Sequence, residues 1–213
     1  MAAFSTRGLR TYLLKKSAAA GSPTAITAVT AAKPAVVTPA LTQGGYVKIT
    51  GTGLGSIDNR VFKVGAGSTL LGSDASNEAG ASASGSADEY TLATDFTGFC
   101  INSLARDVPA GETISTATFC NPDAQVAGAP AGAGTLTWGG PIDFCDLGFQ
   151  EMQSWLDNGG EAVLVVEFPN NAGDMAVPIE INSYSESFEL NAAGTWTGGA
   201  VVKAKPAYAP NCP

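Results

Sequence analysis

Short stretches in which apolar and polar residues alternate run through most of the sequence, and they predict a mainly β protein. Gly-rich turns such as GTGLGS separate these stretches. The strongest strand candidates are residues 6–14, 46–50, 60–64, 134–140 and 161–168; shorter ones are AITAV, STLLG, TISTATFC and one or two strands within EYTLATDFTGFCINSLA.

A long β-hairpin turned by NAAG is predicted near the end of the sequence. Its first strand places Val177, Ile179 and Ile181 on one face and Glu180 and Asn182 on the other. This period of two is typical of a strand that buries one side against a core.

A helical period of apolar residues occurs once, after residue 145. Asp146 is a suitable N-cap, and DNGG at 157–160 contains residues that tolerate a left-handed C-cap. We therefore expect a β-sandwich or half-barrel with one α-helix packed on it, plus a small inserted β domain. The apolar face of that helix consists of Leu147, Phe149, Met152, Trp155 and Leu156.

Residues Ser73 to Ala87 (SDASNEAGASASGSA) form a low-complexity segment without apolar periodicity. Such a composition is typical of a flexible loop or linker, so this segment is predicted to lie outside the core.

Composition argues against many kinds of enzyme. Charged residues make up 14% of the 213 residues, against roughly 25% in an ordinary soluble domain, and histidine is absent. The lack of histidine excludes Ser-His-Asp and Cys-His nucleophile systems, histidine general bases and histidine-ligated zinc. We therefore predict a protein that is not an enzyme.

The net charge of −8 conceals a separation of charges along the chain. Residues 1–57 contain six basic and no acidic residues, whereas residues 107–202 contain 13 acidic and no basic ones. In a monomer these would be two solvated surfaces, but in a self-assembling protein they suit contact between the basic arm of one copy and the acidic face of the next. The acidic half disfavours a sequence-reading nucleic-acid binder. Candidates for contacts between copies are Arg7, Arg10, Lys15 and Lys16.

The remaining motifs predict no catalytic, cofactor-binding or metal-binding site. GTGLG at 51–55 and GAG at 65–67 fit hairpin turns better than phosphate loops. The carboxylate pairs Asp143 with Asp146 and Asp88 with Glu89 fit solvated or helix-capping roles better than acid–base work. The three tryptophans, Trp138, Trp155 and Trp196, are expected in the core rather than in a ligand groove.

Four cysteines, Cys100, Cys120, Cys145 and Cys212, permit three disulfide pairings and contain no C-x-x-C motif. Reduced, buried cysteines are the default for a cytosolic chain, whereas disulfides fit a particle that leaves the cell. Cys100 with Cys120 and Cys145 with Cys212 is the pairing we favour, since the first two lie on strands expected to be neighbours. Neither a signal-peptide apolar region nor a membrane span is predicted.

The order of motifs in the second half resembles the tail tube (major tail) proteins of long-tailed bacteriophages. A strand with FCINSL, the turn ARDVPAGET, STATFC and a strand ending in GPIDF precede the helix; EAVLVVEFPNNAG, SYSESF and GAVVKAKPAY follow it. The opening TRGLRTYLLKKS resembles the first strand of that family. AITAVTAAKPAVVTPA and YVKITGTGLGSIDNRVFKV are similar to a small β module common in phage structural proteins.

This resemblance implies a tail-tube core domain at residues 1–21 and 88–213, and an inserted β module with its flexible loop at 22–87. It further implies a virion protein, assembled in the host cytoplasm, that forms homohexameric rings stacked into a tube. Implied partners are further copies, the tape measure, terminator and baseplate or tip proteins, and DNA passing non-specifically through the lumen, with no membrane. An acidic lumen would repel the DNA backbone. Alternative functions are another phage tail or decoration protein, or a cell-surface β-sandwich binding module.

Overall fold

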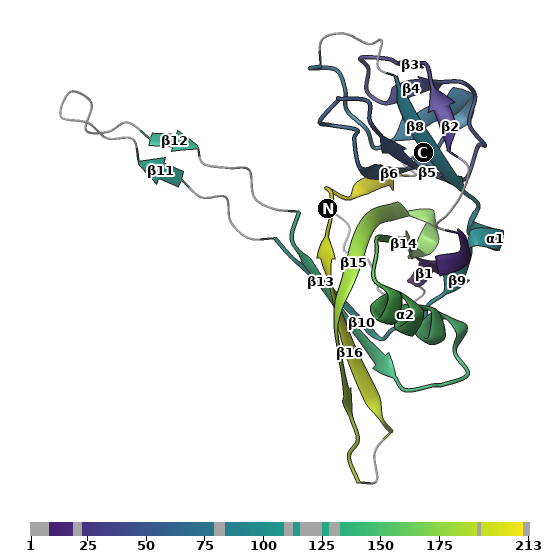
Figure 1. Cartoon of the computed structure of the whole chain (residues 1–213), viewed down its shortest axis with the longest axis vertical. Coiled ribbons are helices and arrows are strands. Elements are labelled where there is room, and N and C mark those ends of the chain that lie inside the picture. Colours follow the sequence, from purple (N-terminus) through teal and green to yellow (C-terminus); the bar gives the residue numbers. More distant parts are fainter. Residues whose placement is uncertain are drawn as a thin grey trace.

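The described part of the chain is built from two large antiparallel β-sheets, a separate two-stranded sheet and one long helix, which confirms the predicted fold class (Figure 1). The computed structural model describes residues 9–18, 23–78, 84–108, 113–115, 125–127, 133–190 and 193–210, with only the backbone described at 113–115, 125–127 and 171.

The larger sheet has eight strands. Seven of them follow the order β10-β13-β16-β15-β14-β1-β9, and β17 pairs with the first residues of β15. It curls into a half-barrel, so that Leu104 of β10 and Val166 of β14 line one cavity of about 510 Å³. Its strands are β1 (Arg10–Leu14), β9 (Phe96–Gly98), β10 (Ser103–Asp107), β13 (Thr135–Pro141), β14 (Ala162–Phe168), β15 (Gly173–Ser187), β16 (Thr195–Val202) and β17 (Ala207–Pro210).

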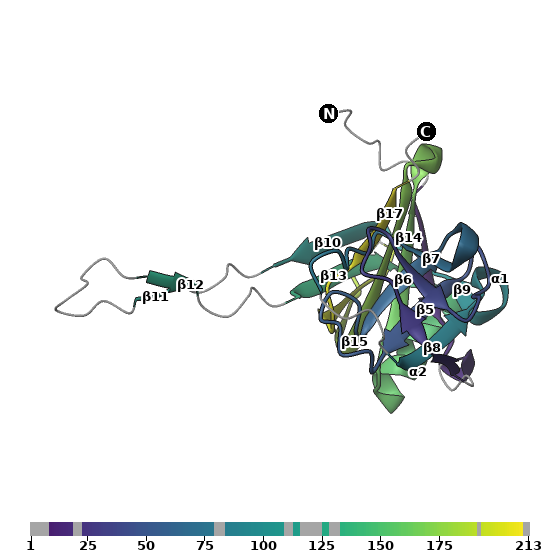
Figure 2. The same cartoon turned by 90° about the horizontal axis from the view of Figure 1, so that it is seen from above.

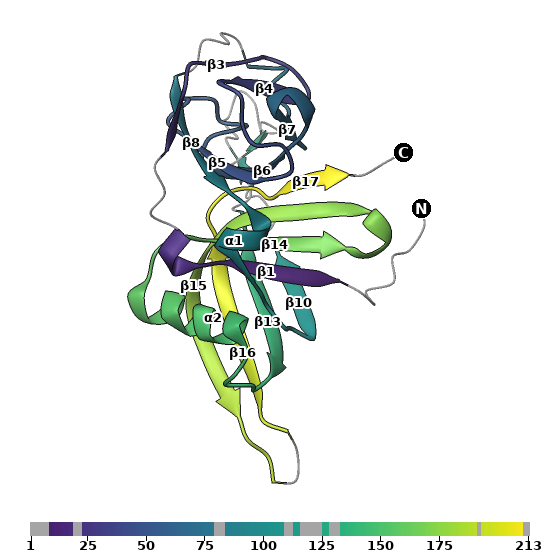
Figure 3. The same ribbon diagram turned by 90° about the vertical axis from the view of Figure 1, so that its right-hand side faces the viewer.

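The predicted helix is α2 (Leu147–Asn158), which lies across the half-barrel (Figure 3). Asp146 caps it as predicted, because its Oδ1 accepts a hydrogen bond from the Phe149 N–H at 2.7 Å. The indole N–H of Trp155 donates to the carbonyl of Leu14 at 2.7 Å and thus ties the helix to β1. The prediction that Leu147 belongs to the buried face was wrong: it occupies the first turn and is 67% exposed.

The three tryptophans lie in the core of the half-barrel, as predicted. Trp138, Trp155 and Trp196 are at most 2% exposed. Phe99 contacts both Trp138 and Trp196, at ring-centroid distances of 6.2 and 5.6 Å, so aromatic packing fills the space between sheet and helix.

The second sheet has seven strands in the order β2-β8-β5-β6-β7-β4-β3 and its own apolar core. β5 and β6 coincide with the predicted strands, and GTGLG at 51–55 lies in the turn between them, as predicted. The strands are β2 (Thr24–Ile26), β3 (Ala28–Val29), β4 (Ala35–Thr38), β5 (Tyr46–Thr50), β6 (Arg60–Val64), β7 (Thr69–Leu71) and β8 (Gly85–Tyr90).

The prediction that Ser73–Ala87 is a loop outside the core was wrong for its two ends. Ser73, Ala75 and Ala87 are at most 2% exposed, and Ala87 belongs to β8, which pairs with both β2 and β5. Small side chains fit between closely packed strands, so low apolar periodicity did not mean low burial here. β8 continues across the predicted domain boundary at residue 87, and that boundary stays a prediction.

Short elements complete the chain: α1 (Leu92–Asp95) and the 3-10 turns η1 (Lys16–Ala18), η2 (Ala66–Ser68) and η3 (Pro169–Asn171). β11 (Thr113–Ser115) and β12 (Gln125–Ala127) pair with each other between β10 and β13 in the sequence. Figure 2 shows this two-stranded sheet standing well away from the body of the protein. The rest of the predicted strand TISTATFC lies outside the described residues.

Candidate functional site

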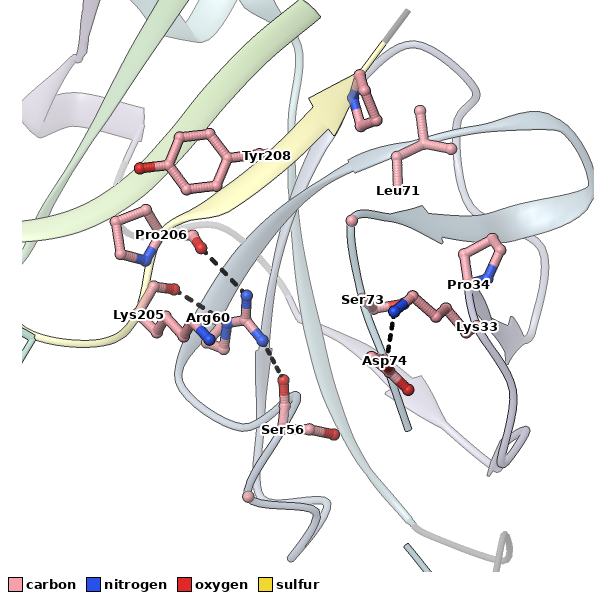
Figure 4. Close-up of a pocket in the computed structure, with 13 residues that line it drawn as sticks. Lys33, Pro34, Ser56, Arg60, Leu71, Ser73, Asp74, Lys205, Pro206 and Tyr208 are labelled. Atoms are coloured by element: carbon pink, nitrogen blue, oxygen red, sulfur yellow. Dashed lines mark hydrogen bonds and ion pairs between the residues drawn. The ribbon is translucent and has the colours of Figure 1, made fainter. Parts of the chain in front are cut away.

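A buried arginine joins the second sheet to the C-terminal segment of the chain. Arg60 begins β6 and is only 9% exposed. Its Nε–H donates to the carbonyl of Lys205 at 2.9 Å, Nη2 donates to the carbonyl of Pro206 at 3.2 Å, and Nη1 donates to the carbonyl of Ser56 (Figure 4). Burial lowers the pKa of this guanidinium, and the three carbonyls compensate for lost hydration.

Two lysines of the second sheet pair with carboxylates of the half-barrel. Lys48 Nζ lies 2.9 Å from Glu161, and Lys63 pairs with Asp174. Lys48 belongs to β5 and Glu161 precedes β14, whereas Lys63 belongs to β6 and Asp174 to β15. Some basic and acidic residues that are far apart in the sequence therefore pair within one subunit.

Aromatic residues pack against one another at the same boundary between the sheets. The Phe96 ring lies edge-on to Tyr46 and Tyr90, at centroid distances of 5.8 and 6.2 Å. Burial raises the pKa of Tyr90 to about 12 and that of Tyr46 further still. The two parts of the chain are thus held by polar, ionic and apolar contacts together.

One glycine allows the C-terminal strand to approach the second sheet. Gly72 follows β7 with φ +79°, and a Cβ built on it would lie 2.0 Å from the carbonyl oxygen of Tyr208. No side chain fits there without moving β17, so glycine is required both for the backbone conformation and for the space.

A groove of about 660 Å³ opens between the C-terminal segment and the loops of the second sheet (Figure 4). Lys33 and Lys205 line it as exposed cations, although Lys33 is paired with Asp74 at 2.8 Å. An almost wholly apolar pocket of about 410 Å³ continues the groove. The two share Gly72, Tyr208 and Pro210.

The predicted basic arm has contacts within the subunit where the structure describes it. Arg7 lies outside the described residues, and Arg10 is exposed at the start of β1, opposite Glu167. Lys15 donates to the carbonyl of Thr94 at 2.6 Å. Lys16 is fixed more firmly: its Nζ donates to the carbonyl of Gly159 and lies 4.0 Å from the centre of the Trp155 ring. A role of these residues between copies stays a prediction.

Exposed apolar side chains gather at the end of the β15–β16 hairpin and at the start of α2. The exposed fractions are 68% for Phe188 and 94% for Leu190 at the hairpin tip, and 66% for Phe144 before the helix. Apolar side chains at such exposure mark contact surfaces when they cluster. Sequence reasoning missed these exposed side chains, although Phe188 and Leu190 alternate with polar residues up to the NAAG turn, and this continued alternation at the tip was the available signal.

The other sequence candidates do not converge on one place. Cys100 and Cys145 are both exposed, and neither forms a disulfide within the part of the chain that the structure describes. Their predicted partners, Cys120 and Cys212, lie outside the described residues, so the pairing stays a prediction. Of the carboxylate pairs, Asp146 caps α2, and Glu89 accepts a hydrogen bond from the Thr42 N–H at 2.9 Å.

The comparisons with known proteins assign no family. No protein-family model matches the sequence, and no curated protein is similar to it. Among the residues that the structure describes, no helix has the length and hydropathy to cross a membrane, and no three potential His, Cys, Asp or Glu ligands cluster around a metal position.

Proposed function

We propose that this protein is a structural subunit that associates with copies of itself into stacked homohexameric rings, as the tail tube protein of a long-tailed bacteriophage. DNA would pass through the lumen of the resulting tube. Its partners would be the other tail proteins, and its location would be the virion. The order of strands, helix and terminal hairpin on which the family resemblance rests is also the order of elements β9 to β17.

The observation that carries the proposal is the pair of hairpins that project beyond the half-barrel. β11 and β12 pair only with each other among the described strands, and they lie far from both sheets (Figures 1 and 2). A two-stranded sheet alone is marginally stable in water, so such an arm gains stability when another chain covers it. The exposed tip of the β15–β16 hairpin presents a second surface of the same kind.

Charge supports the same assignment. Lys48, Lys63 and Lys203 each pair with an acid of the half-barrel, whereas Asp143 before α2 and Glu186 on the projecting hairpin remain exposed. An acidic surface without basic residues repels a nucleic-acid backbone, and this property suits a channel along which DNA slides.

Size-exclusion chromatography with light scattering tests the proposal on the purified chain. We expect a species with six times the mass of the 21.4 kDa subunit, in equilibrium with larger stacks. Shortening the arm by removing residues 109–132 should leave the thermal unfolding temperature unchanged and reduce the stacks. A monomer at every concentration would contradict the proposal.

A further inference from the structure

The tip of the β15–β16 hairpin combines apolar and acidic side chains. Phe188 and Leu190 are 68% and 94% exposed, and Glu186 and Glu189 are exposed beside them. Phe188 packs partly over Gly194 of its own hairpin, but Leu190 points into solvent. Such side chains, at the end of a projecting element, are suited to insertion into another surface.

The groove beside β17 has the complementary character. Its walls carry the cation Lys205 and the Lys33–Asp74 ion pair, and its continuation is lined by Gly72, Tyr208 and Pro210 together with the start of β15, where Asp174 is paired with Lys63. Tyr208 is 48% exposed there, and thus offers an aromatic face for an apolar side chain. The chemistry of the groove therefore matches an apolar segment that also carries negative charge.

Tip and groove of one subunit cannot meet. β15 connects them: Gly173 and Asp174 at its start line the apolar pocket, and Ser187 at its end leads into the tip. Figures 1 and 3 show the tip at one extreme of the long axis, well away from β17. The partner that satisfies both surfaces is consequently a second copy.

We infer that the tip of one copy, with Glu189 and Leu190, seats in the groove of the next copy, between β17 and the loops that contain Lys33 and Gly72. This inference rests on the proposed self-association and names its contact. The contact joins two different surfaces, so a pair of copies still has one unused tip and one unused groove, and the association repeats. In this contact Glu189 of one copy forms an ion pair with Lys205 of the next, and the Leu190 side chain packs on the Tyr208 ring.

Site-specific photo-crosslinking tests the contact directly. A benzophenone amino acid replaces Leu190, and equal amounts of ¹⁵N-labelled and unlabelled protein are mixed, so that crosslinks between copies have mixed isotope patterns. We expect mass spectrometry to place these crosslinks at residues 33–34, 71–74 or 205–210. The same probe at Val201, which is also exposed, is the matched control and should not crosslink to those segments.

A charge exchange tests the pairing in solution. Glu189→Lys and Lys205→Glu each place like charges in the contact, so each variant alone should need a roughly tenfold higher concentration to assemble. An equimolar mixture restores both junctions, because each tip then finds an oppositely charged groove, and assembly should recover. Asp157→Lys, an exposed reversal at the end of α2, should change little. Circular dichroism and melting temperature establish that all three variants fold.

The outcomes separate this inference from the proposed function. Wild-type assembly with crosslinks from Leu190 to other segments, or without recovery in the mixture, would overturn the tip–groove contact and leave self-association intact. Crosslinks from the β11–β12 arm to the groove would likewise overturn it. Wild-type protein that stays monomeric would overturn both.

Discussion

The Nε–H of Arg60 donates to the carbonyl of Lys205 at 2.9 Å, across 145 positions of the sequence. This bond fixes the C-terminal segment against the second sheet, and the neighbouring bond to Pro206 strengthens it. Because β17 continues from this segment and pairs with β15, Arg60 couples the second sheet to the half-barrel.

Replacing Arg60 by alanine should therefore weaken the whole subunit. Three carbonyls lose a charged donor in a buried place, and hydrogen bonds to charged groups are worth about 1.5–3 kcal/mol each. We expect a loss of about 2–4 kcal/mol in the free energy of unfolding, measured by urea denaturation. Arg10→Ala, at an exposed position, is the control and should stay within about 0.5 kcal/mol. Equal effects of the two variants would contradict the coupling.

Gly72→Ala should destabilise the protein more than Gly67→Ala. Both glycines have positive φ, +79° and +62°, so both variants carry the cost of a left-handed alanine, about 1–2 kcal/mol. Only at position 72 does the new methyl group collide with the Tyr208 carbonyl, whereas nothing lies within 4 Å of a Cβ at position 67. Thermal unfolding of both variants measures the difference, and identical melting temperatures would show that β17 does not pack as described.

The N-cap of α2 leads to a local prediction. Asp146→Ala removes the acceptor of the Phe149 N–H and should cost about 1 kcal/mol of stability, measured by urea denaturation. Asp157→Ala removes an acid from the last turn, where a negative charge opposes the helix dipole, so it should be neutral or slightly stabilising. The reverse order of stabilities would contradict the helix boundaries.

Alkaline pH should open the boundary between the two sheets. Burial raises the pKa of Tyr90 from 10 in the unfolded chain to about 12. The neutral hydroxyl therefore stabilises the fold fully below pH 10, and this contribution is lost as the pH rises towards 12. Spectrophotometric titration should show Tyr90 ionising near pH 12, as the difference between wild type and Tyr90→Phe. Ionisation near pH 10 in the folded protein would contradict its burial.

Reversal of the predicted basic arm should have two distinct effects. Lys16→Glu places a carboxylate against the Gly159 carbonyl and the Trp155 ring, so it should lower the melting temperature of the subunit itself. Arg10→Glu places a like charge opposite Glu167 at an exposed position, so it should lower the melting temperature less than Lys16→Glu does, and it should reduce assembly. Light scattering together with thermal unfolding separates the two effects, and unchanged assembly of Arg10→Glu would remove Arg10 from the contacts between copies.

Local signals explain which parts of the fold the sequence predicts. Helix α2 follows from the spacing of Phe149, Met152 and Trp155 and from the cap at Asp146, and β5 and β6 follow from alternation between Gly-rich turns. Leu147 was wrongly predicted to be buried because the apolar period identifies one face of the helix, but not how much of that face the sheet covers. Ser73–Ala87 was misplaced because small residues carry little apolar signal even when buried.

The candidate surfaces depend on contacts that no local pattern contains. Arg60 meets Lys205, and Lys48 meets Glu161, only because the two sheets pack together. The charge separation along the sequence suggested pairing of basic and acidic segments, but it did not distinguish pairing within a subunit from pairing between copies. The lysines of β5 and β6 pair within the subunit, whereas we assign the acidic hairpin tip to the groove of the next copy.

Electron microscopy of the concentrated, purified protein is the most direct test of the proposed assembly. Self-association through the projecting hairpins predicts rings with sixfold rotational symmetry and a continuous central lumen, stacked into tubes. Particles that remain single subunits at high concentration, or that close as dimers without a lumen, would contradict it.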